Sequence, residues 1–400
     1  MKSWERILFI LSALFAVSSL LGELFWPAHV RFLLDDLFFP FGLLYMANTF
    51  LKKKEWRWLI FSFVLLSFWG MASDFLANAS FRIAPVGMWL RWLKWPIILL
   101  TVAQFGELKF QKRAVESGVV IGFFCLAGLN LFMMLNPFGF GEALNGFYAP
   151  KPEVLLANHH EFGAFRLSGT VLNPNNNAIL FGLFLLFFLH IDPRKYWKYI
   201  LLAFILIFLT QSRTVLITSV LVLVFYVVRA NTRKINLIVI PSGIIAIVTG
   251  LFIFRSTNLL SIINGSAFHS DSWTERVDHY SILFKSSLSD LILGHGIILD
   301  PFTQLGFYFD SSYLSITYQY GIVGMLMWFA ALGSIFFLLR RWNRKSSYAF
   351  FLLVFILGIG MTNFTFLNVE CATLLMFLAG AWVFLEGEKK LGNHSEEKTD

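Results

Sequence analysis

The stretch NPNNNAILFGLFLLFFLH, from Asn173 to His190, decides the fold class of this chain. Asn173 is a favourable N-cap and Pro174 suits the first turn of a helix, so the stretch starts as a helix. The residues that follow, from Ala178 to Leu189, are all apolar. A run of this length and composition predicts a helix that crosses a membrane.

The composition of the whole chain agrees with a bilayer as its solvent. Of its 400 residues, 57% are hydrophobic and 14% are charged, whereas soluble domains have about 25% charged residues. Cys125 and Cys371 lie far apart in apolar runs, so neither a disulfide framework nor a zinc site is expected. Membrane topology explains the net charge of +8, and we expect no nucleic-acid partner.

Similar apolar runs recur along the sequence. They predict an all-α polytopic membrane protein with about twelve transmembrane helices. A single multi-pass domain would cover residues 1–386, followed by a polar cytoplasmic tail over residues 387–400. The expected spans are 7–26, 33–51, 58–74, 88–106, 116–136, 173–190, 197–211, 213–228, 235–254, 317–339, 347–366 and 369–386.

Lysines and arginines predict the orientation. Most of the 32 lie in alternate connections between the expected spans, as in Lys52–Lys54, Arg194–Lys198 and Arg340–Lys345. Positive charge concentrates on the cytoplasmic side of membrane proteins, so both termini are expected in the cytoplasm.

Two external connections are long, about 137–172 and 255–316. Loops of this length are uncommon unless they are functional or disordered. Both are rich in Phe and Leu and lack low complexity, which disfavours disorder. In the second loop, four apolar residues between Trp273 and Phe284 recur at helical spacing. They predict a short helix lying on the membrane.

The densest polar signal is the motif RLSGTVLNPNNNA, which begins at Arg166. Gly169 suits a turn, and Asn173, Pro174 and Asn175 suit the start of a helix. An arginine close to a membrane helix is costly to bury unless it is paired. The helix start presents free N–H groups and the positive end of its dipole to the same region. Arg166 is therefore a candidate for binding an anion.

A second signal is the motif TQSRT, which begins at Thr210 between two apolar runs. It predicts a tight external hairpin with Arg213 at its tip. Alone, Arg213 would be interpreted as an interfacial arginine that reaches lipid headgroups. Together, Arg166 and Arg213 can grip a diphosphate through bidentate, charge-assisted hydrogen bonds.

A third group of polar residues precedes the tenth expected span. Gly294 and Gly296 flank His295 in a flexible turn, and Asp310 stands at the start of the span. Asp310 has two interpretations. It can be the N-cap of that helix, or it can be a general base that takes the proton of a sugar hydroxyl. His295 is the alternative base.

Other polar residues of the long loops are weaker candidates. Arg276 could join the two arginines, but a salt bridge with an acidic neighbour on its own helix explains it equally well. The remaining possible bases are His159, His160 and Glu161.

Several functional classes lack their motifs in this sequence. It has no phosphate-binding P-loop, no dinucleotide-binding glycine pattern, no zinc-protease motif and no nucleophile elbow. We therefore expect neither a cofactor nor a metal ion.

In this order, the three signals resemble the O-antigen ligase/polymerase superfamily of bacterial membrane glycosyltransferases. The family pattern is R-x-x-G-x-x-x-N-P-N-x-x-A, then T-x-S-R, then a G-x-G turn with a His-Asn or Asp-Asn pair, then G-I-x-G. The resemblance covers about residues 165–330, and the first five spans match only in hydropathy. The matching residues are Arg166, Gly169, Asn173, Pro174, Asn175, Ala178, Ser212, Arg213, Gly294, Gly296, Asp310, Gly321 and Gly324.

The resemblance implies metal-independent transfer of a glycan from undecaprenyl diphosphate, on the external face of the cytoplasmic (inner) membrane. It implies that the arginines hold the diphosphate leaving group. A base in the second loop would activate an acceptor hydroxyl, with inversion at the anomeric carbon. The implied partners are the lipid-linked glycan, the bilayer, and a chain-length regulator and flippase of the same pathway.

One position departs from the ligases that the chain resembles. They have a histidine where this chain has Asp310, and Ser311 stands where the family commonly has Asn. The departure favours a Wzy-type polymerase of O-antigen, capsular or exopolysaccharide. A ligase that transfers glycan to a lipid or protein acceptor is the first alternative. The second is a non-enzymatic flippase or transporter, which is disfavoured because the sequence lacks the matching halves common in transporters.

Overall fold

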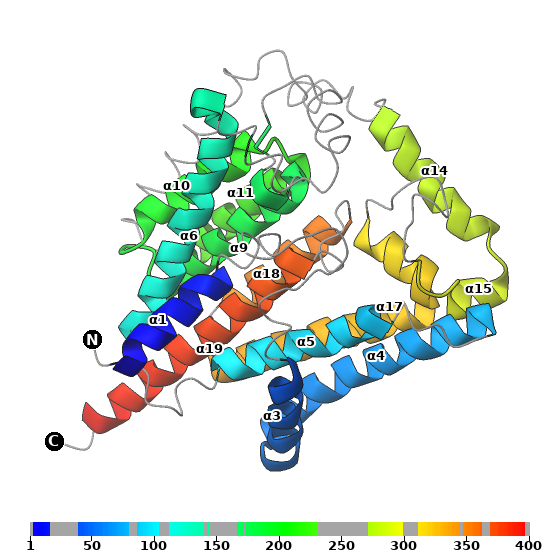
Figure 1. The fold of residues 1–400 in the computed structure, drawn as a ribbon, viewed down its shortest axis with the longest axis horizontal. Helices are drawn as coiled ribbons and strands as arrows, with labels where there is room; N and C mark the ends of the chain where they lie inside the picture. Colours follow the sequence, from blue (N-terminus) through cyan, green and yellow to red (C-terminus); the bar gives the residue numbers. More distant parts are fainter. Residues whose placement is uncertain are drawn as a thin grey trace.

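The computed structural model describes residues 3–16, 39–79, 86–103, 112–139, 143, 166–167, 169–171, 173–230, 271–298, 311–343, 347–361 and 369–396. Secondary structure within these ranges is helical (Figure 1). The α-helices are α1 (Ser3–Ala16), α3 (Phe39–Lys52), α4 (Arg57–Asn78), α5 (Val86–Ala103), α6 (Lys112–Leu135), α9 (Pro174–Ile191), α10 (Trp197–Leu209), α11 (Arg213–Ala230), α14 (Asp271–Lys285), α15 (Leu288–Leu293), α17 (Ser312–Trp342), α18 (Tyr348–Gly360) and α19 (Val369–Glu396). Short 3-10 helices are η1 (Lys54–Trp56), η3 (Pro137–Gly139) and η4 (Gly169–Val171).

The predicted all-α class is confirmed for the described residues. Every expected span contains at least part of a described helix except 235–254, which lies outside the described residues. By length and composition, α4, α6, α9 and α17 are candidates for crossing a membrane, while α10, α11, α18 and α19 contain shorter apolar helices. The chain is therefore a multi-pass helical membrane protein, and the count of twelve spans stays a prediction.

α17 and α19 extend beyond their expected bounds. α17 begins at Ser312 rather than at 317, and it is broken at Gly321, where φ is 69° and ψ is −178°. α19 continues past 386 to Glu396, because the polar segment begins with good helix formers such as Lys389 and Lys390. The predicted short helix in the second long loop is confirmed as α14.

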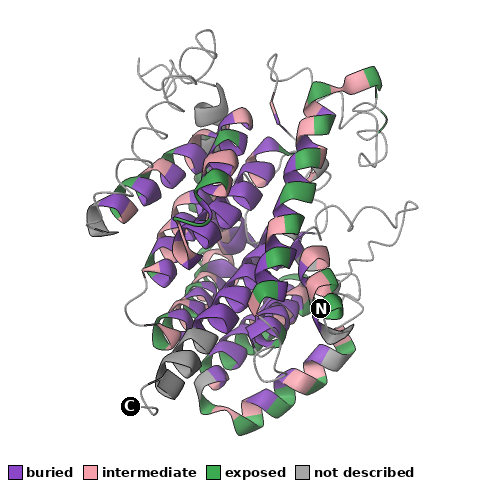
Figure 2. Cartoon of the chain, turned by 90° about the vertical axis from the view of Figure 1, so that its left-hand side faces the viewer, coloured by how far each residue is buried: buried purple, intermediate pink, exposed green. Residues whose placement is uncertain are grey.

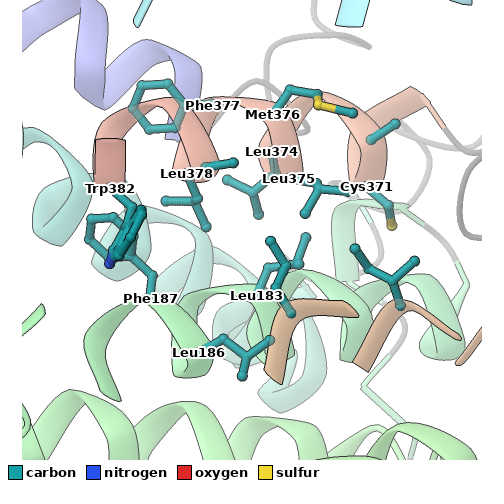
Figure 3. Packing of buried hydrophobic residues seen from close by; sticks show 14 of the residues in the cluster. Leu183, Leu186, Phe187, Cys371, Leu374, Leu375, Met376, Phe377, Leu378 and Trp382 are labelled. Atoms are coloured by element: carbon teal, nitrogen blue, oxygen red, sulfur yellow. The ribbon is translucent and has the colours of Figure 1, made fainter. Parts of the chain in front are cut away.

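α9 forms the centre of the core. All of its residues from Asn177 to Leu189 are buried, since the sequence leaves this stretch no polar face. Figure 2 shows buried residues concentrated in the interior of the helical bundle. α10, α11, α18 and α19 pack around it. Figure 3 shows Leu183 and Phe187 of α9 facing Leu375 and Trp382 of α19. α9 therefore has protein on the sides where a lone membrane helix would have lipid.

A second group of helices surrounds α4. α4 packs against α5 and α17, and α5 packs in turn against α3 and α19. Figure 1 shows α4 and α5 running side by side, with α15 next to one end of α4. The polar residues at that end of α4 and those at the start of α9 form the two clusters from which the candidate site is built.

Candidate functional site

Two arginines lie close together where α9 and α11 begin. Arg166 Nε donates a hydrogen bond to Thr210 O at 3.0 Å, and its Nη2 lies 3.5 Å from Asn175 Oδ1. Arg213 is the first residue of α11. Burial and the positive charge of Arg213 lower the pKa of Arg166 to about 10, so Arg166 stays charged at neutral pH. Two like charges held together would attract the same anion.

The turn between α10 and α11 positions this pair. Thr210 Oγ1 donates to Ile207 O at 2.6 Å and accepts from Ser212 N at 3.2 Å. Gln211 adopts the left-handed region with φ of 56°, which lets the chain reverse directly between the helices. The predicted tight hairpin is therefore confirmed, and it directs Thr210 O toward Arg166.

The start of α9 is capped as predicted. Asn173 Oδ1 accepts hydrogen bonds from Asn175 N at 2.9 Å and Asn176 N at 3.2 Å, with Pro174 at the first helical position. One detail of the prediction was wrong: these two N–H groups are occupied by the cap rather than free for an anion. The start of α9 can therefore favour an anion through its dipole, not through these two hydrogen bonds.

A buried asparagine pair fixes the turn after Arg166. Asn177 Nδ2 donates to Asn130 Oδ1 at 2.8 Å and to Leu167 O at 3.0 Å, and both asparagines are fully buried. Gly169 has φ of 59°, and a Cβ there would lie 1.4 Å from Asn130 Oδ1. Gly169 is thus required both for the predicted turn and for the approach of α6. The sequence analysis missed Asn130, whose only signal was a polar residue inside an apolar run.

The break in α17 is the centre of the second cluster. At Gly321 the helix is interrupted, so the preceding carbonyl groups need donors from elsewhere. Tyr318 O accepts from His295 N at 2.9 Å, and Gln319 O accepts from Gly296 N at 3.1 Å. Ser73 Oγ also donates to Gln319 O at 3.1 Å, and Trp69 Nε1 donates to Tyr320 O at 2.8 Å. The Gly294–Gly296 turn and α4 together replace the missing helical donors.

The glycines of two separate sequence motifs meet at this break. A Cβ on Gly294 would lie 2.3 Å from Gln319 O, and a Cβ on Gly321 would lie 2.1 Å from Ile292 O. Both glycines have positive φ, 92° and 69° respectively. Only residues without a Cβ let the two backbones approach so closely.

His295 is held against α17 by its ring as well as by its backbone. Its ring stacks on that of Tyr318 at a centroid distance of 4.1 Å. Nδ1 lies 3.2 Å from Tyr318 O, and because a carbonyl only accepts, Nδ1 carries the proton in that hydrogen bond. Nε2 lies 3.9 Å from Asp290 Oδ2. In the neutral ring Nε2 therefore keeps the lone pair that a base would use.

A buried carboxylate supports the turn from the α4 side. Asp74 Oδ1 accepts from Ile297 N at 3.0 Å and from Asn78 Nδ2 at 3.2 Å. Asp74 is 1% exposed. The sequence analysis missed it, because it appeared only as the last residue of an apolar span. An acidic residue at the end of such a span was the available signal.

Comparison with known families matches part of the chain to a family of membrane proteins. Residues 198–329 match the family model described as O-antigen ligase. This match, which covers part of the chain, supports the resemblance to the O-antigen ligase/polymerase superfamily. The matched region contains Arg213, His295 and the broken part of α17, while Arg166 precedes it. No curated protein matches the chain.

The start of α17, within the matched region, decides between the two interpretations of position 310 as far as the helix cap is concerned. The helix is capped by Ser311, whose Oγ accepts from Leu314 N at 3.4 Å, so the interpretation of Asp310 as the N-cap was wrong. Asp310 itself lies outside the described residues, as do His159, His160 and Glu161. Arg276 lies on α14, but its side chain is also outside the described residues.

The described contacts connect the two clusters through α18. At the arginine end, Thr218 of α11 lies beside Gly358 of α18. At the other end, Ser311 Oγ donates to Gly360 O at 3.2 Å, and Tyr280 Oη donates to Ser311 Oγ at 3.3 Å. The structure thus brings Arg166 and Arg213 together, and it places His295 separately, against α17.

Gly321 can be tested against a glycine of the same helix. Gly321→Ala places a methyl group against Ile292 O in a strained backbone conformation, whereas a Cβ on Gly333 would meet nothing within 4 Å. We expect Gly321→Ala to lower the thermal stability of the detergent-purified protein clearly and to expose the Gly294–Gly296 turn to proteolysis. Gly333→Ala should match the parent in both assays. Equal stability and equal proteolysis of the two variants would contradict the requirement for a residue without a Cβ at Gly321.

Proposed function

We propose that this protein polymerises undecaprenyl-diphosphate-linked oligosaccharide repeat units on the external face of the cytoplasmic membrane. The observation that carries the proposal is the close pair Arg166 and Arg213, with the pKa of Arg166 lowered by burial and by Arg213. A diphosphate is the anion that suits two neighbouring guanidinium groups, because each can give bidentate hydrogen bonds. The family match over residues 198–329 supports a lipid-linked glycan as the substrate class.

The arginines act on the leaving group. When the bond between the anomeric carbon and the diphosphate oxygen breaks, the electron pair stays on that oxygen. Undecaprenyl diphosphate then leaves with additional negative charge. Arg166 and Arg213 stabilise this charge as it develops, which is a large contribution in reactions of this kind. Transfer therefore proceeds without a metal ion.

A base completes the transfer. The acceptor hydroxyl oxygen attacks the anomeric carbon from the face opposite the diphosphate, and its proton passes to the base, so the configuration inverts. We assign the base to Asp310, because Ser311 already caps α17 and leaves that carboxylate without a capping role. His295, with its Nε2 lone pair, is the alternative.

A ligase is the second candidate function. The description of the matching family, O-antigen ligase, favours it. The aspartate at position 310, where the ligases that the chain resembles have a histidine, favours the polymerase. The two functions share the donor and the arginine pair, and they differ in the acceptor.

Alanine substitutions test the arginine pair. We expect Arg166→Ala and Arg213→Ala each to reduce polymer formation by about 100-fold or more, since each removes charge stabilisation from the leaving group. Arg194→Ala is the matched control, because Arg194 is exposed at the opposite end of α9. The measurement uses purified protein in vesicles with undecaprenyl-diphosphate repeat units, and gel ladders report chain length.

The result also separates the alternatives. A ladder from the parent and from Arg194→Ala that disappears in both other variants supports the polymerase. Transfer that needs an added lipid or protein acceptor assigns a ligase. Movement of substrate across the bilayer without transfer assigns a transporter. Unchanged ladders in both alanine variants at positions 166 and 213 would refute the role of the pair.

A lysine at position 166 should make activity depend on pH. The site lowers the pKa of Arg166 from its ordinary value to about 10. The same burial and the same charge of Arg213 should lower the pKa of a lysine at this position below its ordinary value of ~10.4. The cation is present below that pKa and is lost as pH rises through it. The activity of Arg166→Lys relative to the parent should therefore fall as the pH rises, and it should do so below the pKa of an ordinary lysine. If the ratio of Arg166→Lys activity to parent activity did not change with pH, this would contradict the influence of burial and Arg213 on position 166.

The two candidate bases can be separated by conservative variants. We expect Asp310→Asn to lower turnover about 100-fold or more while donor binding is kept, since a positioned base contributes ~10²–10⁴. His295→Gln should lower turnover much less. Single-turnover rates and donor affinity are measured for both variants. The reverse order of effects would assign the base to His295.

A further inference from the structure

The outer side of the elbow between α14 and α15 carries three exposed apolar side chains. Phe284 is 87% exposed, Leu288 73% and Ile292 40%. Leu288 and Ile292 are four residues apart on α15 and share one face. Phe284 stands in the last turn of α14. These three residues are called the elbow stripe below.

The elbow stripe is separate from the apolar side by which α14 packs on the protein. Ile282 and Leu283 of α14 pack against Ile298, Leu314 and Tyr318. A helix at a water-facing surface buries one apolar face and turns polar residues outward. The elbow exposes these three apolar side chains as well as the polar Lys285 and Ser289, so the elbow stripe requires an apolar environment of its own.

The position of the elbow indicates what this environment is. Ser73 Oγ of α4 donates to Leu293 O at 2.7 Å, which places α15 against α4 (Figure 1). α4 is a candidate membrane span. Its exposed large apolar residues recur along the helix at Trp58, Phe61, Val64, Leu65, Phe68, Phe75 and Leu76. The elbow stripe therefore lies near the end of a lipid-facing surface.

We propose that the elbow stripe inserts into the interfacial layer of the bilayer, which makes the α14–α15 elbow a lipid-binding surface. Phe284, Leu288 and Ile292 enter the boundary between headgroups and acyl chains. Lys285 is exposed beside Phe284, and its ammonium group reaches the lipid phosphates. The lipid surface is the partner, because the elbow stripe adjoins the lipid-facing residues of α4. The proposal holds whichever reaction the protein catalyses.

Insertion of the elbow stripe fixes the height of the Gly294–Gly296 turn relative to the bilayer. Gly294 follows Leu293 directly, so an anchored α15 holds the Gly294–Gly296 turn at the membrane surface. The diphosphate of a lipid-linked substrate lies at the same level, because its polyprenyl chain stays in the bilayer.

The experiment compares two adjacent positions on α15. Leu288→Cys and Ser289→Cys are made in a Cys125→Ser background, because Cys125 is exposed while Cys371 is buried. Each is labelled with an environment-sensitive fluorophore. The full-length protein is placed in phosphatidylethanolamine–phosphatidylglycerol vesicles that carry nitroxide quenchers on the acyl chains near the headgroups. Ser289 is also exposed but polar, so it is the matched control.

We expect the label at 288 to be quenched several-fold more by the lipid nitroxide than the label at 289. Aqueous iodide should show the opposite order. Equal lipid quenching at both positions would overturn the proposal. Absence of lipid quenching at 288 together with a 288–288 crosslink would overturn it in favour of a second copy of the chain. Melting temperatures equal to those of the parent verify that both variants are folded.

Discussion

The backbone carbonyls of an interrupted helix in apolar surroundings need new hydrogen-bond donors, and this constraint determines how α4, α15 and α17 pack together. The break at Gly321 is tolerated because the Gly294–Gly296 turn and α4 supply donors to the carbonyls before it. The same contacts fix α15 against α4 and α17 and hold the His295 ring on Tyr318. The position of the Gly294–Gly296 turn, which carries His295, is thus fixed by backbone hydrogen bonds to α17 as well as by side-chain packing.

The other half of the candidate site depends on polar residues buried at the start of α9. Asn130 and Asn177 hold the turn that carries Arg166, and the α10–α11 hairpin holds Thr210 against it. α18 lies between this cluster and the start of α17, through Thr218–Gly358 and Ser311–Gly360. Under the proposed function, the donor diphosphate binds at the start of α9 and α11, and the base lies at the start of α17. The glycan then extends from one group of helices to the other.

Sequence reasoning predicted features whose causes are local. The Asn173 cap, the α10–α11 hairpin and α14 follow from neighbouring residues, so periodicity and turn chemistry were sufficient. Asn130 and Asp74 were missed because their partners, Asn177 and Ile297, lie far along the chain. Asp310 was weighed as a cap because aspartate caps helices well, but the neighbouring Ser311 takes that position.

The burial of α9 has a consequence for biosynthesis. One side of α9 is completed by α19, which leaves the ribosome after α10, α11 and α18 (Figure 3). Until then lipid must cover that side, and lipid can do so at little cost because acyl chains are as apolar as leucine. The start of α9, with its asparagines and Arg166, has no such substitute within the bilayer. A late arrival of α19 therefore costs little at the apolar middle of α9. It costs more at the polar start of α9, where lipid cannot replace the missing contacts.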